Sequence, residues 1–333
     1  MMKTPKIIFI LFLLIIGNSV LAQEGKKAKI LISKVIDHPA LNSTTQGIID
    51  ALASSGYVLN QNLELKIESA QASPVLAQQI AGKFVHMKPD IVVGVGTVSA
   101  QSFLKYAKAN KVKLIFSSVT DPIGASLISD LNCPEQNISG VSNFVELNPQ
   151  LIMIKKILPK IKKLGILYNP GELNSVSIVE KLEQLCPTLG ITLIKQTIDK
   201  TGDVAQSALK LSQNVDAIFI SNDNTALSAL PLIVKSAKTK KIPVFVSDTD
   251  AVSLGAIAAL GPNQYEIGKQ TGRMIVRLME GEECSKQPIE FPEKVELFIN
   301  ADAAKELEIQ IPKDLLDTAK NIVSSKTSNS ERT

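Results

Sequence analysis

Short polar side chains gather directly after several apolar segments of this chain, where they could bind a small charged molecule. The apolar run at 164–168 is followed by the turn NPG and then by the polar segment ELNS, at residues 172–175. Proline and glycine end strands, and asparagine and serine are favoured at helix starts. The pattern predicts a buried strand, a turn and a helix. In a parallel sheet, ligands bind at such carboxyl ends of strands.

The same arrangement recurs along the chain. Polar residues also follow the apolar segments at 91–95, 113–116, 217–220 and 244–246. The candidate ligand-binding residues of all these segments are Thr97, Ser99, Ser117, Ser118, Thr120, Asp121, Tyr168, Asn169, Glu172, Asn174, Ser175, Asn222, Asp223, Asn224 and Asp248. Each group alone is equally consistent with a helix cap or a turn, because the same residue types are favoured there. Their recurrence at successive strand ends favours a binding site.

The residue types of these segments suit a ligand that carries both charges. Hydroxyls and free backbone N–H groups at a helix start after Gly96 suit a carboxylate. Asp248 follows the apolar segment PVFV, and a buried ammonium needs a negative charge nearby. Glu172 and Asp223 compete for that role, as does Asp121. A zwitterion fits this set better than a neutral sugar, since the chain has no tryptophan on which a sugar ring could stack.

Signals for catalysis or for a cofactor are weak. The segment GVGTVS at 94–99 lacks the third glycine of a dinucleotide fingerprint, and no Gly-x-Ser-x-Gly elbow occurs. The only histidines are His38 and His86; His38 could contact a ligand from the first loop, but a place in a surface loop is the expectation. We therefore expect no enzyme, no cofactor and no metal. The alternative is an exported, hydrolase-like enzyme that uses Ser117 or Ser175 in the same cleft.

The first residues have the composition of a signal peptide. Lys3 and Lys6 precede an apolar run at 7–16, and small residues follow before Gln23. The run is short for a membrane-spanning helix. Residues 1–22 are therefore expected to be cleaved, leaving a periplasmic or otherwise extracytoplasmic, soluble protein. Removing the two lysines lowers the formal net charge from +4 to +2, too little to indicate nucleic acid as a partner.

The cysteines do not indicate a metal site. Cys133, Cys186 and Cys284 lie far apart and have no metal-ligand spacing. One disulfide with one free thiol, or three buried thiols, are both compatible with this count.

Strand and helix patterns alternate along most of the chain. Strands are predicted at 29–33, 63–67, 90–95, 113–116, 165–168, 191–197, 217–220, 244–246, 256–260 and 295–299. Helices are predicted between them, at 76–87, 97–110, 149–158, 175–189, 204–212, 225–237, 264–279 and 301–307, with one more ending near Gly56. Pro231 should kink the helix in which it lies.

This alternation predicts an α/β fold of two doubly wound parallel-sheet lobes with a ligand cleft between them. The irregular segment 124–143 separates the two series and is expected to be a connection without a core element. Residues from about 318 onward are polar and expected to be disordered.

Six segments together resemble the ABC transporter substrate-binding proteins of the tryptophan/tyrosine-type family. They are HPALNSTTQGI, the Gly96-Thr97 edge, SSVTDPIGA, GILYNPGELNS, DAIFISNDNTA and PVFVSDTD, and the similarity covers nearly all of residues 29–312. The resemblance implies a type I periplasmic-binding fold whose lobes close on a solute, with no catalytic step. It also implies an ABC permease as partner, although a sensor that docks on a membrane receptor would look the same in sequence.

The resemblance further implies roles for individual residues. Thr97 and the edge from Ser117 to Thr120 would hold a carboxylate from the first lobe. The second lobe would complete the pocket with Asn169, Glu172, Asn174, Ser175, Asp223, Asn224 and Asp248. The ligand would be an amino acid, with aromatic ones suggested by the family, and the protein a monomer.

The fold of that family also implies how the chain divides. The first lobe would comprise residues 28–143 and about 262–284, and the second 144–261 and about 285–312. Residues 313–333 would form a disordered polar tail.

Overall fold

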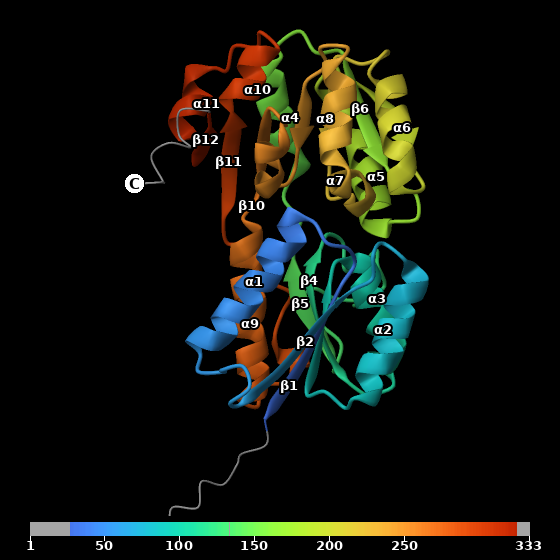
Figure 1. Cartoon of the computed structure of the whole chain (residues 1–333), viewed down its shortest axis with the longest axis vertical. Helices are drawn as coiled ribbons and strands as arrows, with labels where there is room; N and C mark the ends of the chain where they lie inside the picture. Colours follow the sequence, from blue (N-terminus) through green and yellow to red (C-terminus); the bar gives the residue numbers. More distant parts are fainter. Residues whose placement is uncertain (1–26, 133, 325–333) are drawn as a thin grey trace, which may run out of the picture.

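The computed structural model describes residues 27–132 and 134–324. The expected signal peptide and Cys133 lie outside the described residues. The described chain folds into two α/β lobes, one above the other in Figure 1. No helix within the described ranges is long and apolar enough to cross a membrane.

The first lobe is built on a five-stranded sheet in the order β2-β1-β3-β4-β5, in which all neighbours are parallel. Its strands are β1 (Ala28–Lys34), β2 (Leu63–Ser69), β3 (Ile91–Val95), β4 (Lys113–Val119) and β5 (Ile138–Ser142). Its helices are α1 (Pro39–Ser54), α2 (Pro74–His86), α3 (Thr97–Lys108), α9 (Gln264–Met279) and the 3-10 turn η3 (Cys284–Lys286). Helices α1 and α9 pack on one face of the sheet, and α2 and α3 on the other.

The second lobe has a seven-stranded sheet in the order β12-β11-β10-β9-β8-β6-β7, parallel except for the β10–β11 pair. Its strands are β6 (Lys163–Tyr168), β7 (Thr192–Thr197), β8 (Ala217–Ile220), β9 (Val244–Val246), β10 (Ala258–Pro262), β11 (Val295–Asn300) and β12 (Asn321–Val323). Its helices are α4 (Leu147–Ile157), α5 (Leu173–Thr188), α6 (Val204–Leu211), α7 (Asn224–Ser228), α8 (Leu230–Lys238), α10 (Ala301–Glu306), α11 (Lys313–Thr318), η1 (Thr201–Asp203) and η2 (Thr249–Leu254).

Continuous apolar runs explain why these strands form. Every residue of β3, β8 and β9 is buried, as expected for parallel strands covered on both faces. Alternate side chains then fill separate cores: Phe219 packs with α4 and α5, while Ile218 packs with α6 and α8. The carboxyl ends of the central strands, where the polar segments begin, are thereby held at the interface between the lobes.

Helix α9 returns to the first lobe and lies beside α1 (Figure 1). Glycines make this approach possible. A Cβ at Gly47 would lie 2.1 Å from the Tyr265 carbonyl oxygen, and one at Gly268 would lie 2.0 Å from that of Thr44. The close packing fixes the first turn of α9, which includes Gln264, next to α1.

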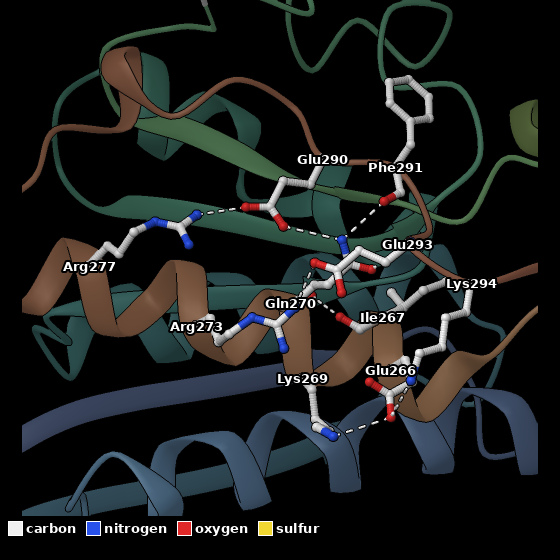
Figure 2. Close-up of polar contacts among 11 residues, drawn as sticks. Glu266, Ile267, Lys269, Gln270, Arg273, Arg277, Glu290, Phe291, Glu293 and Lys294 are labelled. Carbon is white, nitrogen blue, oxygen red and sulfur yellow. Dashed lines mark hydrogen bonds and ion pairs between the residues drawn. The ribbon is translucent and has the colours of Figure 1, made fainter.

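The last crossover between the lobes is tied to α9 (Figure 2). Arg277 Nη2 pairs with Glu290 Oε1 at 2.6 Å, and Arg273 Nη2 pairs with Glu293 Oε1 at 2.8 Å. Between them, Gln270 Nε2 donates to the Phe291 carbonyl oxygen at 3.0 Å. These contacts hold residues 290–293 against α9, and the first strand of the second lobe after this crossover, β11, begins at Val295.

Two expectations about the elements need revision. The segment 124–143 contains the strand β5, because its backbone pairs with β4 despite a polar sequence. Residues 313–323, expected to be disordered, form α11 and the edge strand β12, which pairs with β11 through backbone hydrogen bonds. The interruption expected at Pro231 is present as a complete break, since the helix predicted at 225–237 is divided into α7 and α8 at Ala229, two residues before the proline.

Candidate functional site

A small cavity lies between the lobes where the carboxyl ends of the two sheets meet. It is lined by His38, Ala40, Leu41, Thr97, Ser118, Thr120, Asn143, Asn174, Asn222, Asn224, Leu227, Asp248 and Gln264. The free space open to a water-sized sphere is about 10 Å³, room for about one water molecule. The lobes are thus closed onto a polar interior.

The first-lobe wall presents hydroxyl groups. Thr97 begins α3 after Gly96, whose φ of +86° suits glycine, and the buried Thr97 Oγ1 has no hydrogen-bond partner. Ser118 also has a left-handed φ, +54°, at an irregularity in the β4–β5 pairing. Such backbone strain clusters at functional sites. These hydroxyls and the helix N-terminus suit an anionic group.

The second-lobe wall presents oxygen acceptors. Asn174 Nδ2 donates to the Asn222 carbonyl oxygen at 2.7 Å, which leaves Asn174 Oδ1 buried without a partner. Asn222 Oδ1 is likewise unpaired and buried. Unpaired buried acceptors cost free energy unless a donor arrives, so this wall suits a ligand rich in N–H groups.

Asp248 is the carboxylate of this wall. It is 2 % exposed, and Gln264 Nε2 donates to its Oδ1 at 2.6 Å. Burial raises the pKa of Asp248 to about 7, because a charge in a poorly solvated place is unfavourable. The neutral carboxyl group is therefore favoured in the closed cavity, and a cation next to it would favour the ionised form instead.

The Glu172 carboxylate accepts several hydrogen bonds, all from groups of the second lobe. It accepts from the backbone N–H groups of Asn224 and Thr225, both at 2.9 Å, and from the Thr225 hydroxyl at 2.7 Å. The amides of Asn224 and Asn174 also donate to it, at 2.6 and 3.4 Å. Glu172 therefore caps α7 and orients two side chains of the cavity.

Asp223 is likewise hydrogen-bonded within the second lobe. Its carboxylate accepts from the Asn169 N–H at 2.6 Å, the Ser175 hydroxyl at 2.6 Å and the Ala226 N–H at 2.7 Å. Burial and the neighbouring Glu172 charge raise its pKa. Neither acid faces the cavity as a free partner for a ligand.

The candidates predicted from sequence divide into two groups. The structure brings Thr97, Ser118, Thr120, Asn174, Asn222, Asn224 and Asp248 together around the cavity. It places Ser99, Ser117, Asp121, Tyr168, Asn169, Glu172, Ser175 and Asp223 outside its lining. Several of these support the local fold: Ser99 contacts Ser33, and Asn169 closes the turn after β6.

The sequence reasoning missed six lining residues: His38, Ala40, Leu41, Asn143, Leu227 and Gln264. The expectation of a surface histidine was wrong. His38 is 6 % exposed, and its Nε2 lies 3.3 Å from Asn224 Oδ1 of the other lobe. Burial lowers its pKa, which favours the neutral ring. The place of His38 in the loop after β1 could have indicated from the sequence that it lines the site. No feature of the sequence indicated this for Gln264.

Direct contacts hold the lobes together around the cavity. Asn222 Nδ2 donates to Thr120 Oγ1 at 3.4 Å, and Ser177 Oγ donates to Asp121 Oδ2 at 2.8 Å. At the far side, Ser43 Oγ lies 3.5 Å from Asp250 Oδ1. The described conformation is a closed one.

The serines considered for catalysis have other partners. Ser175 Oγ donates to Asp223, and Ser117 Oγ lies 2.7 Å from the Thr271 hydroxyl. Within residues 27–132 and 134–324, neither is hydrogen-bonded to a histidine. This geometry resembles structural serines more than an activated nucleophile.

Two lobes with facing sheet edges and a closed polar cavity define a solute-binding receptor of the type I periplasmic-binding fold. The family model described as ABC transporter substrate binding protein matches residues 29–323. This chain belongs to that family. A tyrosine-binding protein of Clostridioides difficile (strain R20291) is 30% identical over 93% of this chain and 94% of its own length.

Solved structures of similar proteins support the closed assignment. A domain from Streptococcus pneumonia in complex with L-Trp is 30% identical, with a TM-score of 0.85 over 90% of this chain and 100% of that one. A ligand-free, open substrate-binding protein with adhesive properties from Clostridium difficile, also 30% identical, gives a TM-score of 0.67 over 89% and 99%. At equal identity, the lobes described here are arranged more like those of the complex.

Proposed function

We propose that this protein is the extracytoplasmic receptor of an ABC importer and that it binds an amino acid in its zwitterionic form. The observation that carries the proposal is the polarity of the cavity. An unpaired hydroxyl lines its first-lobe wall, at Thr97, and a carboxylate and unpaired acceptors line its second-lobe wall, at Asp248 and Asn174. A carboxylate and an ammonium on one small molecule would satisfy both walls at once.

The two lobes have distinct tasks in this proposal. Thr97 and Ser118, near the N-terminus of α3, would bind the ligand carboxylate. Asp248 would pair with the ammonium, with Asn174 Oδ1 accepting a further hydrogen bond. Because each lobe binds one charge of the ligand, the ligand binds the closed state more tightly than the open one. This difference in binding free energy drives closure.

The class of amino acid follows from the relatives. One is described as tyrosine-binding, and another was solved with L-Trp, so we propose an aromatic amino acid. The proposal extends to a periplasmic or otherwise extracytoplasmic monomer that delivers its ligand to a membrane permease.

Titration calorimetry against the twenty amino acids tests this function. We expect binding of tyrosine or tryptophan with a stoichiometry of one, and no binding of monosaccharides. Tight sugar binding without amino-acid binding would exclude the proposal. A parallel turnover assay tests the enzyme alternative: product formation that disappears in Ser175→Ala or Ser117→Ala would establish a catalyst instead.

The affinity should depend on pH through Asp248. Burial raises the pKa of its carboxyl group to about 7, and only the ionised form attracts an ammonium. The dissociation constant should therefore rise about tenfold for each pH unit below 7 and change little between pH 7 and 8. His38 adds little, since burial lowers its pKa. Calorimetry at pH 5, 6, 7 and 8 measures this, with circular dichroism reporting the fold; equal affinity throughout would show that Asp248 is ionised before the ligand arrives.

A further inference from the structure

Gln264, the first residue of α9, reaches across the cavity. Its side chain is buried, and its Nε2 donates to Asp248 Oδ1 at 2.6 Å. Its Oε1 accepts from Ser118 Oγ at 3.0 Å and from Thr44 Oγ1 at 3.1 Å. One end of the amide therefore faces the acid of the second lobe, and the other end faces hydroxyls of the first.

This polarity is the one expected of a bound amino acid. A zwitterion presents a donor group and an acceptor group on neighbouring carbons, and a carboxamide presents neutral versions of both. The free space beside the amide is only about 10 Å³. The cavity has no room for an amino acid while the lobes are closed and the Gln264 amide is bonded to Asp248.

We propose that Gln264 is an internal surrogate for the ligand, which closes the empty receptor and must leave Asp248 before an amino acid binds. This inference rests on the proposed function for the identity of the displaced ligand. It assigns to Gln264 a role in setting affinity that differs from that of the residues holding the ligand.

The direction of motion follows from the lobes to which the partners belong. Gln264, Thr44 and Ser118 are all in the first lobe, so their mutual hydrogen bonds survive opening. Of the three hydrogen bonds of the Gln264 amide, only the one to Asp248 joins the two lobes. Opening breaks this bond together with the other contacts between the lobes, and the ligand ammonium then competes with the Gln264 amide for the same carboxylate. Every closed, empty molecule is unavailable to the ligand.

The size of the effect is set by that unavailable fraction. The apparent dissociation constant equals the intrinsic one divided by the fraction of competent molecules. If about 50 to 90 % of the empty protein is closed on Gln264, removing the amide should tighten binding about two- to tenfold. A residue that only contacted the ligand would give the opposite sign.

The test compares Gln264→Met with the wild-type protein. Methionine keeps the volume and the helix but cannot bridge Asp248 to Ser118; Gln264→Ala serves as a second variant. Small-angle X-ray scattering of the ligand-free protein should show a larger radius of gyration in both. Calorimetry with tyrosine or tryptophan should show two- to tenfold tighter binding for Gln264→Met. Gln46→Met, at an exposed position of α1, should change neither measurement.

Other outcomes separate this inference from the proposed function. Weaker binding by Gln264→Met, or unchanged scattering of both ligand-free variants, would overturn the surrogate role. Thr97→Val, which removes an unpaired hydroxyl, should weaken binding without changing the ligand-free scattering. If no amino acid binds any variant, the proposed function fails, while opening of the ligand-free Gln264 variants still supports the internal closure.

Discussion

Asp248→Asn is expected to weaken amino-acid binding about a hundredfold or more. The substitution keeps the shape of the side chain and removes the one carboxylate among the described residues that line the cavity. An ammonium buried without a counter-charge costs about 3–5 kcal/mol, and about 3 kcal/mol corresponds to two decades in the dissociation constant. Calorimetry at pH 8, where Asp248 is largely ionised, measures the loss.

The same variant should not unfold more easily without ligand. The folded-state pKa of Asp248 is raised from 3.8 to about 7, so its contribution to stability is present below pH 3.8 and lost as the pH rises through 7. At pH 8 the wild-type protein bears the cost of a buried charge, and the asparagine variant does not. The unfolding midpoint should therefore stay the same or rise.

Asp250→Asn provides a matched control. Asp250 lies two residues further along the chain and does not line the cavity, and asparagine keeps the oxygen that faces Ser43 Oγ at 3.5 Å between the lobes. We expect less than a threefold change in affinity there. If Asp250→Asn weakens binding as much as Asp248→Asn does, a general field of negative charge binds the ligand, and the specific pairing is wrong.

The order of strands and helices was predictable because it depends on local pattern. Runs such as 91–95 and 217–220 are β-branched or otherwise apolar over their whole length, and each is bounded by turn residues. The structure has strands at these places. By contrast, β5 and β12 pair through their backbones at sheet edges, and their polar or short sequences carry little periodic signal.

The sequence predicted which sheet edge forms the site, but not which residues of that edge line the cavity. Asp248 and Glu172 both follow a strand, yet one lines the cavity while the other is surrounded by donors from α7. Which way each points depends on residues more than fifty positions away in sequence, as in the bond between Glu172 and Thr225. Gln264 is brought to the cavity by the packing of α9 on α1, which local pattern cannot reveal.

The second large effect is expected for Glu172→Gln, on stability. We predict that it lowers the free energy of unfolding by about 3 kcal/mol, the magnitude typical of breaking a buried, charged hydrogen-bond network. Glu172 is buried and accepts from the N–H groups of Asn224 and Thr225 and from the Thr225 hydroxyl. A glutamine amide has one acceptor oxygen, and its NH₂ group would face donors that need an acceptor.

Urea denaturation at pH 8, followed by circular dichroism, measures this loss. Glu180→Gln is the control, because Glu180 is exposed on the same helix, α5, and surface changes of this kind stay within about 0.5 kcal/mol. The two variants should therefore have different effects: Glu172→Gln lowers the stability of the protein, and Asp248→Asn lowers its affinity for the ligand. If Glu172→Gln instead left stability unchanged and abolished binding, Glu172 would be the partner of the ligand ammonium, and the hydrogen bonds to α7 would be exchanged for the ligand when it binds.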